Sequence, residues 1–562
     1  MEKTVSLIVN GDFARGTESW RGIDGARVRG GVIDAEAGGC RRALRLTVEP
    51  EAGRPPWDLL LLQSFAGALR RGDAVCLRAW ARSPDRCRLA FVAERSAPPH
   101  PKCIYQRVRL GPEWAEYRFM GRAEQDAAPG ESRVVLFLGY DPGVIEVAGV
   151  RVENRGDAPD AAFDQTIDYW GGEPPTDAWR PAAIERIERL RKGDLVVRVV
   201  DGAGRPVPGA VVRVEQTRHA FRFGTAAPAR RFLEDAPDNL RFRQEVERLY
   251  NTVTFENDLK WPQFQGLDNV DRAMEWLKAR GIRARGHCLL WGSYEHLAPA
   301  ARSLRGAALR QACLDHASDY AARYRGRLYL WDVVNEAGSN TEVWESTGWD
   351  AFAEAFRRAR AADPGALLCY NDYGIVDESP EYRPKVAARI RQLLDAGAPV
   401  DVLGIQGHMH TPLTPIPRVL EILDEWAAFG KRLEITEFDA GCPDDAVHAR
   451  YVRDFMTAVF SHPQVDAFIL WGFWEGSHWR AKEGGAMFRR DWSKRPGQEE
   501  WERLVLDEWR TRFEGRADAR GEIATRAFHG THAVTAEAGG RRRTAEVEMS
   551  HGRPGRVELR LP

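Results

Sequence analysis

The feature that most constrains the fold is an alternation of short apolar strands and amphipathic helices, repeated eight times between residues 221 and 475. The candidate strands end near Thr225, Asn257, Trp291, Glu336, Tyr373, His410, Asp439 and Glu475. Between strands, apolar residues recur at the spacing of a helix with one buried face, as at Val270, Ala273, Met274 and Leu277. Strand-helix units joined by right-handed crossovers close into a (β/α)8 barrel, an α/β fold, whose strand-end residues surround one mouth.

Two glutamates follow β-branched apolar stretches at the ends of the predicted fourth and seventh strands. Glu336 ends residues 331–336 (WDVVNE), and Glu437 lies within residues 434–439 (EITEFD). Two carboxyl groups facing one cavity can hydrolyse a glycosidic bond, because one protonates the leaving oxygen while the other supports positive charge developing at the sugar carbon. An isolated glutamate after a strand is more often an ion-pair partner or a helix cap. The residues around the pair therefore decide the interpretation.

Composition narrows the classes of partner. The 562 residues are 43% hydrophobic and carry a net charge of -1, which predicts a globular chain of several domains with no electrostatic preference for nucleic acid. The apolar runs are too short to span a membrane. Nineteen tryptophans favour a neutral carbohydrate, since an indole can stack on the apolar face of a sugar ring. The eight cysteines form no Cys-x-x-Cys pair, so neither zinc nor redox chemistry is expected.

Further polar and aromatic residues follow the predicted strands in sequence order. They are Glu256, Asn257 and Lys260 (ENDLKW), His287 and Trp291 (RGHCLLW), Asn335, Asp372 and Tyr373 (NDY), Gln406 and His408 (QGHMH), and Trp471 and Trp479. Together with the two glutamates, these motifs resemble the catalytic domain of glycoside hydrolase family ten, the retaining endo-β-1,4-xylanases. The resemblance covers residues of about 195 to 515.

The resemblance implies a role for each matched residue. Glu336 would be the general acid and then the base, and Glu437 the nucleophile that forms a glycosyl-enzyme, with no metal or organic cofactor. Retention needs the two carboxyl groups about 5 to 5.5 Å apart. The substrate would be xylan or its oligosaccharides. The residues expected to contact it or to shape its cleft are Glu256, Asn257, Lys260, His287, Trp291, Asn335, Gln406, His408, Trp471 and Trp479, with Asp372 and Tyr373 supporting them from behind.

Some positions leave alternatives open. His408 and His410 have no evident third partner for a metal, and the resemblance instead implies that His408 hydrogen-bonds Glu437. Where many members of the family have His-x-Gln after the third-strand tryptophan, this chain has Gly292, Ser293 and Tyr294. This difference leaves the sugar preference on the glycone side open. A β-glycanase with another sugar preference and a non-catalytic glycan-binding protein remain the alternatives.

The rest of the chain predicts three further parts. Residues 1–155 read as a β-sandwich, and NGDF at residues 10–13 with Trp20 resembles carbohydrate-binding modules, although a spacer without a ligand is the alternative. Residues 156–193 read as a linker and a helix. Residues 194–217 and 516–562 alternate like strands, and each is too short to bury a core. We expect these two segments to form one small sandwich, with the barrel of residues 218–515 inserted between them.

The expected cellular location rests on the resemblance alone. Enzymes of this kind are secreted, yet residues 1–5 (MEKTV) lack the apolar core of a signal peptide. Either the protein stays inside the cell or a leader has been removed.

Overall fold

The computed structural model describes residues 5–23, 25–51, 53–159, 163–172, 175–262, 267–377 and 381–562. The chain divides into two compact units, residues 1–174 with 411–413, and residues 175–410 with 414–562. Residues 1–4, where a signal peptide was sought, lie outside the described residues. So do residues 160–162 and 173–174 of the predicted linker.

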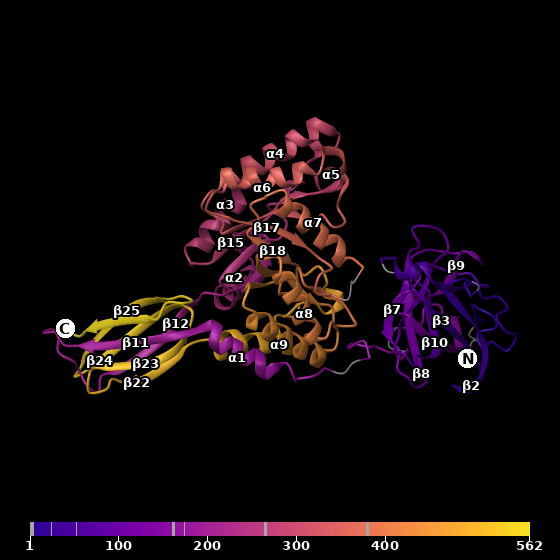
Figure 1. Ribbon diagram of the computed structural model, residues 1–562, viewed down its shortest axis with the longest axis horizontal. Helices are drawn as coiled ribbons and strands as arrows, with labels where there is room; N and C mark the ends of the chain where they lie inside the picture. Colours follow the sequence, from indigo (N-terminus) through magenta and orange to yellow (C-terminus); the bar gives the residue numbers. More distant parts are fainter. Residues whose placement is uncertain are drawn as a thin grey trace. The chain divides into compact units, whose positions relative to one another are not determined.

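The N-terminal unit is a sandwich of two antiparallel sheets (Figure 1). One sheet has the order β2-β3-β10-β5-β8, with β1 beside β10, and the other has the order β4-β9-β6-β7. Leu77, Phe91 and Leu136 are among the fully buried residues between the sheets, because alternate strand residues face the core. The strands are β1 (Val5–Ser6), β2 (Val28–Ala37), β3 (Cys40–Val48), β4 (Leu60–Ser64), β5 (Ala74–Arg82), β6 (Arg88–Arg95), β7 (Lys102–Arg109), β8 (Ala115–Arg122), β9 (Ser132–Phe137) and β10 (Gly143–Asn154).

The second unit contains the predicted barrel, and the fold class is confirmed. Within the described residues, parallel strands follow the order β13-β14-β15-β16-β17-β18-β20-β21, and β21 pairs with β13 to close the ring. These strands are β13 (Arg222–Ala227), β14 (Thr252–Phe255), β15 (Arg283–Trp291), β16 (Leu330–Asn335), β17 (Leu367–Asp372), β18 (Val402–Ile405), β20 (Arg432–Ala440) and β21 (Val465–Leu470).

Two predicted strand ends were wrong. The sixth strand ends at Ile405 rather than near His410, because Gly407 takes a φ of 80° that breaks the extended backbone. His408 then belongs to a separate two-residue strand, β19 (His408–Met409), which pairs with β20. The eighth strand ends at Leu470 rather than near Glu475.

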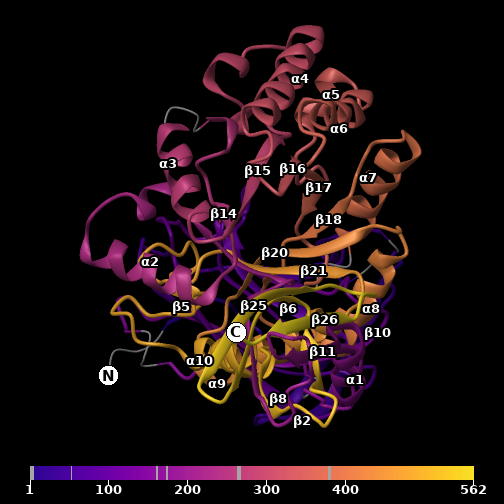
Figure 2. The ribbon, with the colours of Figure 1, turned by 90° about the vertical axis from the view of Figure 1, so that its left-hand side faces the viewer.

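Helices surround the barrel strands (Figure 2). The predicted apolar stripe is confirmed in α3, where Val270, Ala273, Met274 and Leu277 are buried. No helix in the described part of the chain is long and apolar enough to cross a membrane. The helices are α1 (Arg180–Arg191), α2 (Pro237–Leu249), α3 (Leu267–Lys278), α4 (Gly306–Arg323), α5 (Glu342–Thr347), α6 (Asp350–Ala362), α7 (Arg383–Asp395), α8 (Ile416–Ala427), α9 (Asp445–Ser461) and α10 (Pro496–Glu502).

The small sandwich is built from the segments that precede and follow the barrel in the sequence, as predicted. Strand β11 lies between β23 and β26, and β12 lies between β22 and β24, with β25 beyond. Val197, Val212, Val534 and Leu559 are among the buried residues that bring the two halves into one core. The strands are β11 (Lys192–Val200), β12 (Val211–His219), β22 (Arg512–Arg516), β23 (Glu522–Phe528), β24 (Gly530–Ala538), β25 (Arg541–Met549) and β26 (Gly555–Arg560).

The boundaries of this sandwich differ by a few residues from those expected. β11 begins at Lys192 and β12 runs to His219, so the first segment extends beyond 194–217 at both ends. The second segment starts at Arg512 rather than 516, because β22 pairs with β12 in the register Arg512 to Glu215. The barrel therefore occupies the residues between His219 and Arg512.

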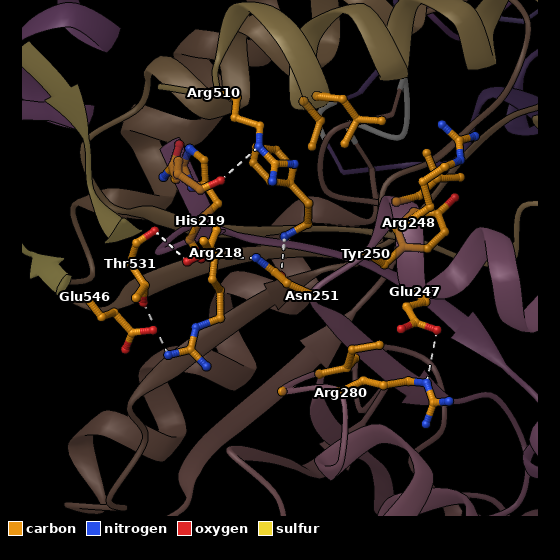
Figure 3. Close-up of a pocket in the computed structure, with 18 residues that line it drawn as sticks. Arg218, His219, Glu247, Arg248, Tyr250, Asn251, Arg280, Arg510, Thr531 and Glu546 are labelled. Carbon is orange, nitrogen blue, oxygen red and sulfur yellow. Dashed lines mark hydrogen bonds and ion pairs between the residues drawn. The ribbon is translucent and has the colours of Figure 1, made fainter. Parts of the chain in front are cut away.

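A cavity of about 500 Å³ lies between the sandwich and the amino-terminal ends of the barrel strands (Figure 3). Arg218, Arg280 and Arg510 are among the side chains that line it. Helices α2 and α3 end beside it, at Leu249 and Lys278. Arg280 Nε donates to Glu247 Oε2 at 3.1 Å, Arg510 Nε donates to the carbonyl of Gln216 at 3.0 Å, and Arg218 Nη2 donates to Thr531 Oγ1 at 3.4 Å.

Removing residues 511–562 tests whether the two halves depend on each other. The truncation takes away β22 to β26 and leaves β11 and β12 with unpaired edges and exposed valines. We expect the melting temperature to fall by about 10 °C or the protein to aggregate, since each kcal/mol lost shifts the midpoint by roughly 2–4 °C in large domains. Arg542→Gln, an exposed substitution on β25, is the control. An unchanged melting curve would show that the tail does not stabilise the first half.

Candidate active site

The two predicted glutamates lie at the carboxyl ends of their strands. Glu336 directly follows β16, and Glu437 lies within β20. Glu336 has a φ of 56°, a left-handed conformation that is strained for a residue with a side chain. Its backbone N–H donates to the carbonyl of Asn371 at 2.9 Å, and its carbonyl accepts from the N–H of Asn340 at 2.9 Å. These contacts hold the chain in the turn that presents the carboxyl group.

Side-chain amides connect the two glutamates. Asn371 Nδ2 donates to Glu437 Oε1 at 2.8 Å and to Asn335 Oδ1 at 2.9 Å. Gln406 Nε2 donates to Glu336 Oε1 at 2.8 Å and lies 3.5 Å from Asn335 Oδ1. Both carboxyl groups are therefore part of one hydrogen-bonded network.

The environment of Glu336 favours its protonated form. Burial raises the pKa of Glu336 above its ordinary value, and the negative charge of Glu437 adds to the rise, while the hydrogen bond from Gln406 opposes it. Trp291 Nε1 also donates to Glu336 Oε2, at 3.1 Å. A buried carboxyl group with a raised pKa can hold a proton and transfer it.

The environment of Glu437 favours its ionised form. Burial alone would raise the pKa of Glu437, but His287, His408 and Lys260 outweigh burial and hold that pKa below its ordinary value. His408 Nε2 lies 3.2 Å from Glu437 Oε2, and His408 Nδ1 lies 3.2 Å from Asp439 Oδ2. Against the effect of burial, these two carboxylates raise the pKa of His408 to about 10. The ring of His408 therefore favours its protonated form at neutral pH, and it lies beside the carboxyl group of Glu437.

A second series of side-chain contacts, which ends at His287, reaches Glu437 from inside the barrel. His287 Nδ1 lies 2.8 Å from Asp332 Oδ2, and Asp332 Oδ1 accepts from Arg285 Nη2 at 2.5 Å. Arg285 and Asp332 were not singled out from the sequence, although both lie inside quoted motifs. Arg285 and His287 stand two apart on β15 and so face the same side. The sequence feature that could have identified Arg285 is a charged residue two positions before His287 in a mostly apolar strand.

Two tryptophan rings lie near the ammonium group of Lys260. Its Nζ lies 5.1 Å from the ring centre of Trp291 and 5.8 Å from that of Trp471, and it donates to Asn257 Oδ1 at 2.8 Å. The Trp471 ring meets His287 edge-on at 5.0 Å. Burial raises the pKa of the neighbouring Glu256. The structure thus gathers the predicted residues of the second, third and eighth strands around one space.

Trp479 forms the exposed edge of the site. Its side chain is 58% exposed, and its Nε1 donates to Asp439 Oδ2 at 2.7 Å. The ring also meets His408 edge-on at 5.0 Å. One end of the indole is therefore fixed while the rest faces solvent.

Asp372 and Tyr373 lie behind Glu336. Asp372 is fully buried and accepts hydrogen bonds from the hydroxyls of Tyr370 and Tyr382 and from the backbone N–H of Gly338. Burial raises the pKa of Asp372 to about 7, with Tyr370 opposing the rise and Glu336 adding to it. Tyr373 stacks on Tyr382 at 4.5 Å. Asp372 therefore anchors the loop that follows Glu336.

The histidine pair shows no metal-binding geometry. His410 Nδ1 lies 3.1 Å from Arg480 Nη2. Among the residues that the structure describes, no group of three or more His, Cys, Asp or Glu side chains is placed to hold a metal ion.

Comparison with known proteins finds one matching family profile and several relatives. Residues 214–501 match the sequence profile described as Glycosyl hydrolase family 10. The chain is 30% identical over 365 residues to the anti-sigma-I factor RsgI6 of Acetivibrio thermocellus, covering 64% of this chain and 46% of that protein. It is 30% identical over 376 residues to endo-1,4-beta-xylanase 1 of Arabidopsis thaliana, covering 63% of this chain and 38% of that protein. The chain thus spans less than half the length of these two relatives.

Among solved structures, xylanase 10B from Thermotoga petrophila RKU-1 in complex with xylobiose aligns with a TM-score of 0.47 at 25% identity. The alignment covers 51% of this chain and 95% of that chain.

Titration of the histidine side chains by NMR tests the charge arrangement. Because Asp439 and Glu437 raise the pKa of His408 to about 10 from an ordinary 6.5, its ring should stay protonated throughout the neutral range. Its contribution to stability is then full below pH 6.5 and lost as the pH rises through 10. His478 is the internal control, since burial and Arg480 lower its pKa to about 4 and keep it neutral. Deprotonation of His408 near pH 6.5 would contradict the arrangement.

Proposed function

This chain belongs to glycosyl hydrolase family 10, and we propose that it hydrolyses the β-1,4-linked backbone of xylan with retention of configuration. The observation that supports this proposal is that the pKa values of two networked carboxyl groups are moved in opposite directions. Burial raises the pKa of Glu336, whereas His287, His408 and Lys260 overcome burial and lower the pKa of Glu437. One group is thereby prepared to donate a proton and the other to attack carbon.

The reaction proceeds in two displacements. Glu437 attacks the anomeric carbon while the carboxyl group of Glu336 gives its proton to the leaving glycosidic oxygen, and a glycosyl-enzyme ester forms. A water molecule then attacks the anomeric carbon while the carboxylate of Glu336 takes a proton from it. The ester bond to Glu437 breaks, so that Glu437 is again a carboxylate and Glu336 is again protonated.

Sugar positioning follows from the donors around the pair. Asn335, held by Asn371, would bond the 2-hydroxyl of the sugar that reacts, and Lys260 and Glu256 would be further partners on the glycone side. Trp471 and the exposed face of Trp479 offer apolar surfaces for sugar rings.

The alternatives differ in chemistry. A non-catalytic, glycan-binding role is the candidate from another class, and one relative is named an anti-sigma-I factor. The retained pair of carboxyl groups, with pKa values moved in opposite directions, favours catalysis. A related β-glycanase with another sugar preference would share this pair. Release of reducing sugar from xylan, but not from mixed-linkage glucan, separates these alternatives from a xylanase.

We further propose that the N-terminal unit binds glycan through the outer face of the sheet β4-β9-β6-β7. Trp57 and Tyr105 are 52% and 45% exposed there, and the hydroxyls of Tyr105 and Tyr140 lie 2.9 Å apart. Beneath them, Val92 and Phe137 form an apolar cluster separate from the core between the sheets. Exposed aromatic rings over an apolar floor are typical of a surface that stacks sugar rings.

Other tryptophans of this unit are less suited to binding. Trp20 is 6% exposed and donates to a backbone carbonyl, and Trp80 packs against Ala37 and Ala43.

Replacing the two glutamates tests the assignment of roles. Glu336→Gln should slow xylan hydrolysis by about 10² to 10⁴, but should slow an activated aryl xyloside far less, because only a poor leaving group needs the proton. Glu437→Gln should abolish turnover of both. A 2-fluoro xylosyl donor should label Glu437, and proton NMR should show the retained anomer first. Equal losses for both substrates in Glu336→Gln, or an inverted product, would contradict the mechanism.

Substitutions on the aromatic face test the N-terminal site. Trp57→Ala and Tyr105→Ala should each weaken retention on insoluble xylan several-fold, since stacking contributes about 0.5–1.5 kcal/mol per ring pair. Turnover of short soluble oligomers should not change. Val9→Ala, at a 45% exposed position of the same unit, is the control. Unchanged retention in the double variant would show that this face is not a binding surface.

A further inference from the structure

Position 292 has no side chain because the space is already occupied. A Cβ at Gly292 would lie 2.2 Å from the backbone oxygen of Asn340 and 2.4 Å from Trp344 Nε1. The backbone N–H of Val343 donates to the carbonyl of Gly292 at 2.9 Å. The loop of residues 337–341 therefore packs directly against the end of β15. This packing explains why the chain cannot carry a histidine after Trp291.

The same loop brings Asn340 to the acid/base glutamate. Asn340 Nδ2 lies 3.2 Å from Glu336 Oε2, which also accepts from Trp291 Nε1 at 3.1 Å. The other oxygen, Oε1, accepts from Gln406 Nε2 at 2.8 Å. Asn340 also contacts the backbone oxygen of Glu336 through its N–H at 2.9 Å and its Nδ2 at 3.4 Å. One residue thus contacts both the carboxyl group and the left-handed backbone of Glu336.

The two carboxyl oxygens of Glu336 consequently differ. A carboxyl oxygen has two lone pairs, and two donors occupy both lone pairs of Oε2. A proton on Oε2 would displace one of these two donors, whereas among the described residues Oε1 accepts one short hydrogen bond, from Gln406 Nε2. The proton is therefore favoured on Oε1.

We infer that Asn340 is a positioning residue for the acid/base: with Trp291 it saturates Oε2 of Glu336, so that Oε1 carries the proton for the leaving oxygen. Gly292 is the residue that makes room for Asn340. The inference rests on the proposed function, because it concerns proton transfer by Glu336. It goes beyond that function by assigning the proton to one atom and by explaining the glycine at position 292.

The test uses Asn340→Ala and Asn340→Asp in the full chain. A donor stabilises the ionised carboxyl group, so its loss should raise the pKa of Glu336 and move the alkaline limb of kcat/KM upward by about one pH unit. The isosteric Asn340→Asp should move the limb further, because it adds a negative charge. At neutral pH, kcat/KM should fall about tenfold for xylo-oligosaccharides, and by less than about twofold for an activated aryl xyloside. A purely structural role would affect both substrates equally and would leave the limb in place.

Gly292→Ala provides an independent route to the same change. Its added methyl group should displace Asn340 and reproduce the shifted alkaline limb. The double variant Gly292→Ala/Asn340→Ala should then show no additional shift, since both substitutions remove one interaction. Thr341→Val, which alters the same loop at a hydroxyl bonded to exposed Glu345, is the matched control and should behave like the parent. Melting curves check that each variant folds.

The two proposals fail in distinguishable ways. A parent enzyme that hydrolyses xylan, combined with unchanged limbs in both Asn340 variants, would overturn the inference and leave the function standing. A parent without activity would contradict the proposed function. In that case the ¹³C carboxyl shift of Glu336 still measures its pKa without turnover. A pKa that does not rise in Asn340→Ala would then overturn the inference as well.

Discussion

A buried carboxylate remains ionised only if nearby positive charge or hydrogen-bond donors offset the cost of its burial, and the interior of the barrel supplies both at Glu437. Transfer of an ion out of water costs several kcal/mol even after relaxation. His408 and His287 lie on two sides of Glu437, and each is itself held by a carboxylate, Asp439 or Asp332. Those carboxylates are paired in turn with Arg480 and Arg285. The site is therefore one continuous chain of alternating acidic and basic side chains.

The closed barrel makes this chain possible. His287 of β15 lies opposite Asp332 of β16 in the strand register, and Arg285, two residues earlier on β15, reaches the other oxygen of the same carboxylate. Glu336 lies outside the chain of charges and receives mainly neutral donors, which is why burial dominates its pKa. The surroundings of two identical side chains thus move their pKa values in opposite directions. The polypeptide achieves this difference by placing cations near one and amides near the other.

Much of this arrangement was predictable from the sequence, because it depends on local periodicity. Alternating strand and helix patterns predicted the barrel, and polar residues at strand ends predicted which side chains would meet. The predicted sixth strand was too long because the sequence does not reveal that Gly407 takes a positive φ. Asn340 carried no signal, since its role depends on a loop conformation that brings it back to Glu336. Trp57 could not be distinguished from Trp20 or Trp80, because exposure is decided by packing between distant strands.

The divided sandwich has a consequence for synthesis of the chain. Arg213 of β12 and its partner Glu514 of β22 are 301 residues apart. Translation proceeds at about 5–20 residues per second, so β11 and β12 wait roughly 15 to 60 seconds for their partners to leave the ribosome. During this interval their edges and valines have no sheet to join. The first and last barrel strands, β13 and β21, pair with each other, so closure of the barrel brings the end of β12 and the start of β22 close together.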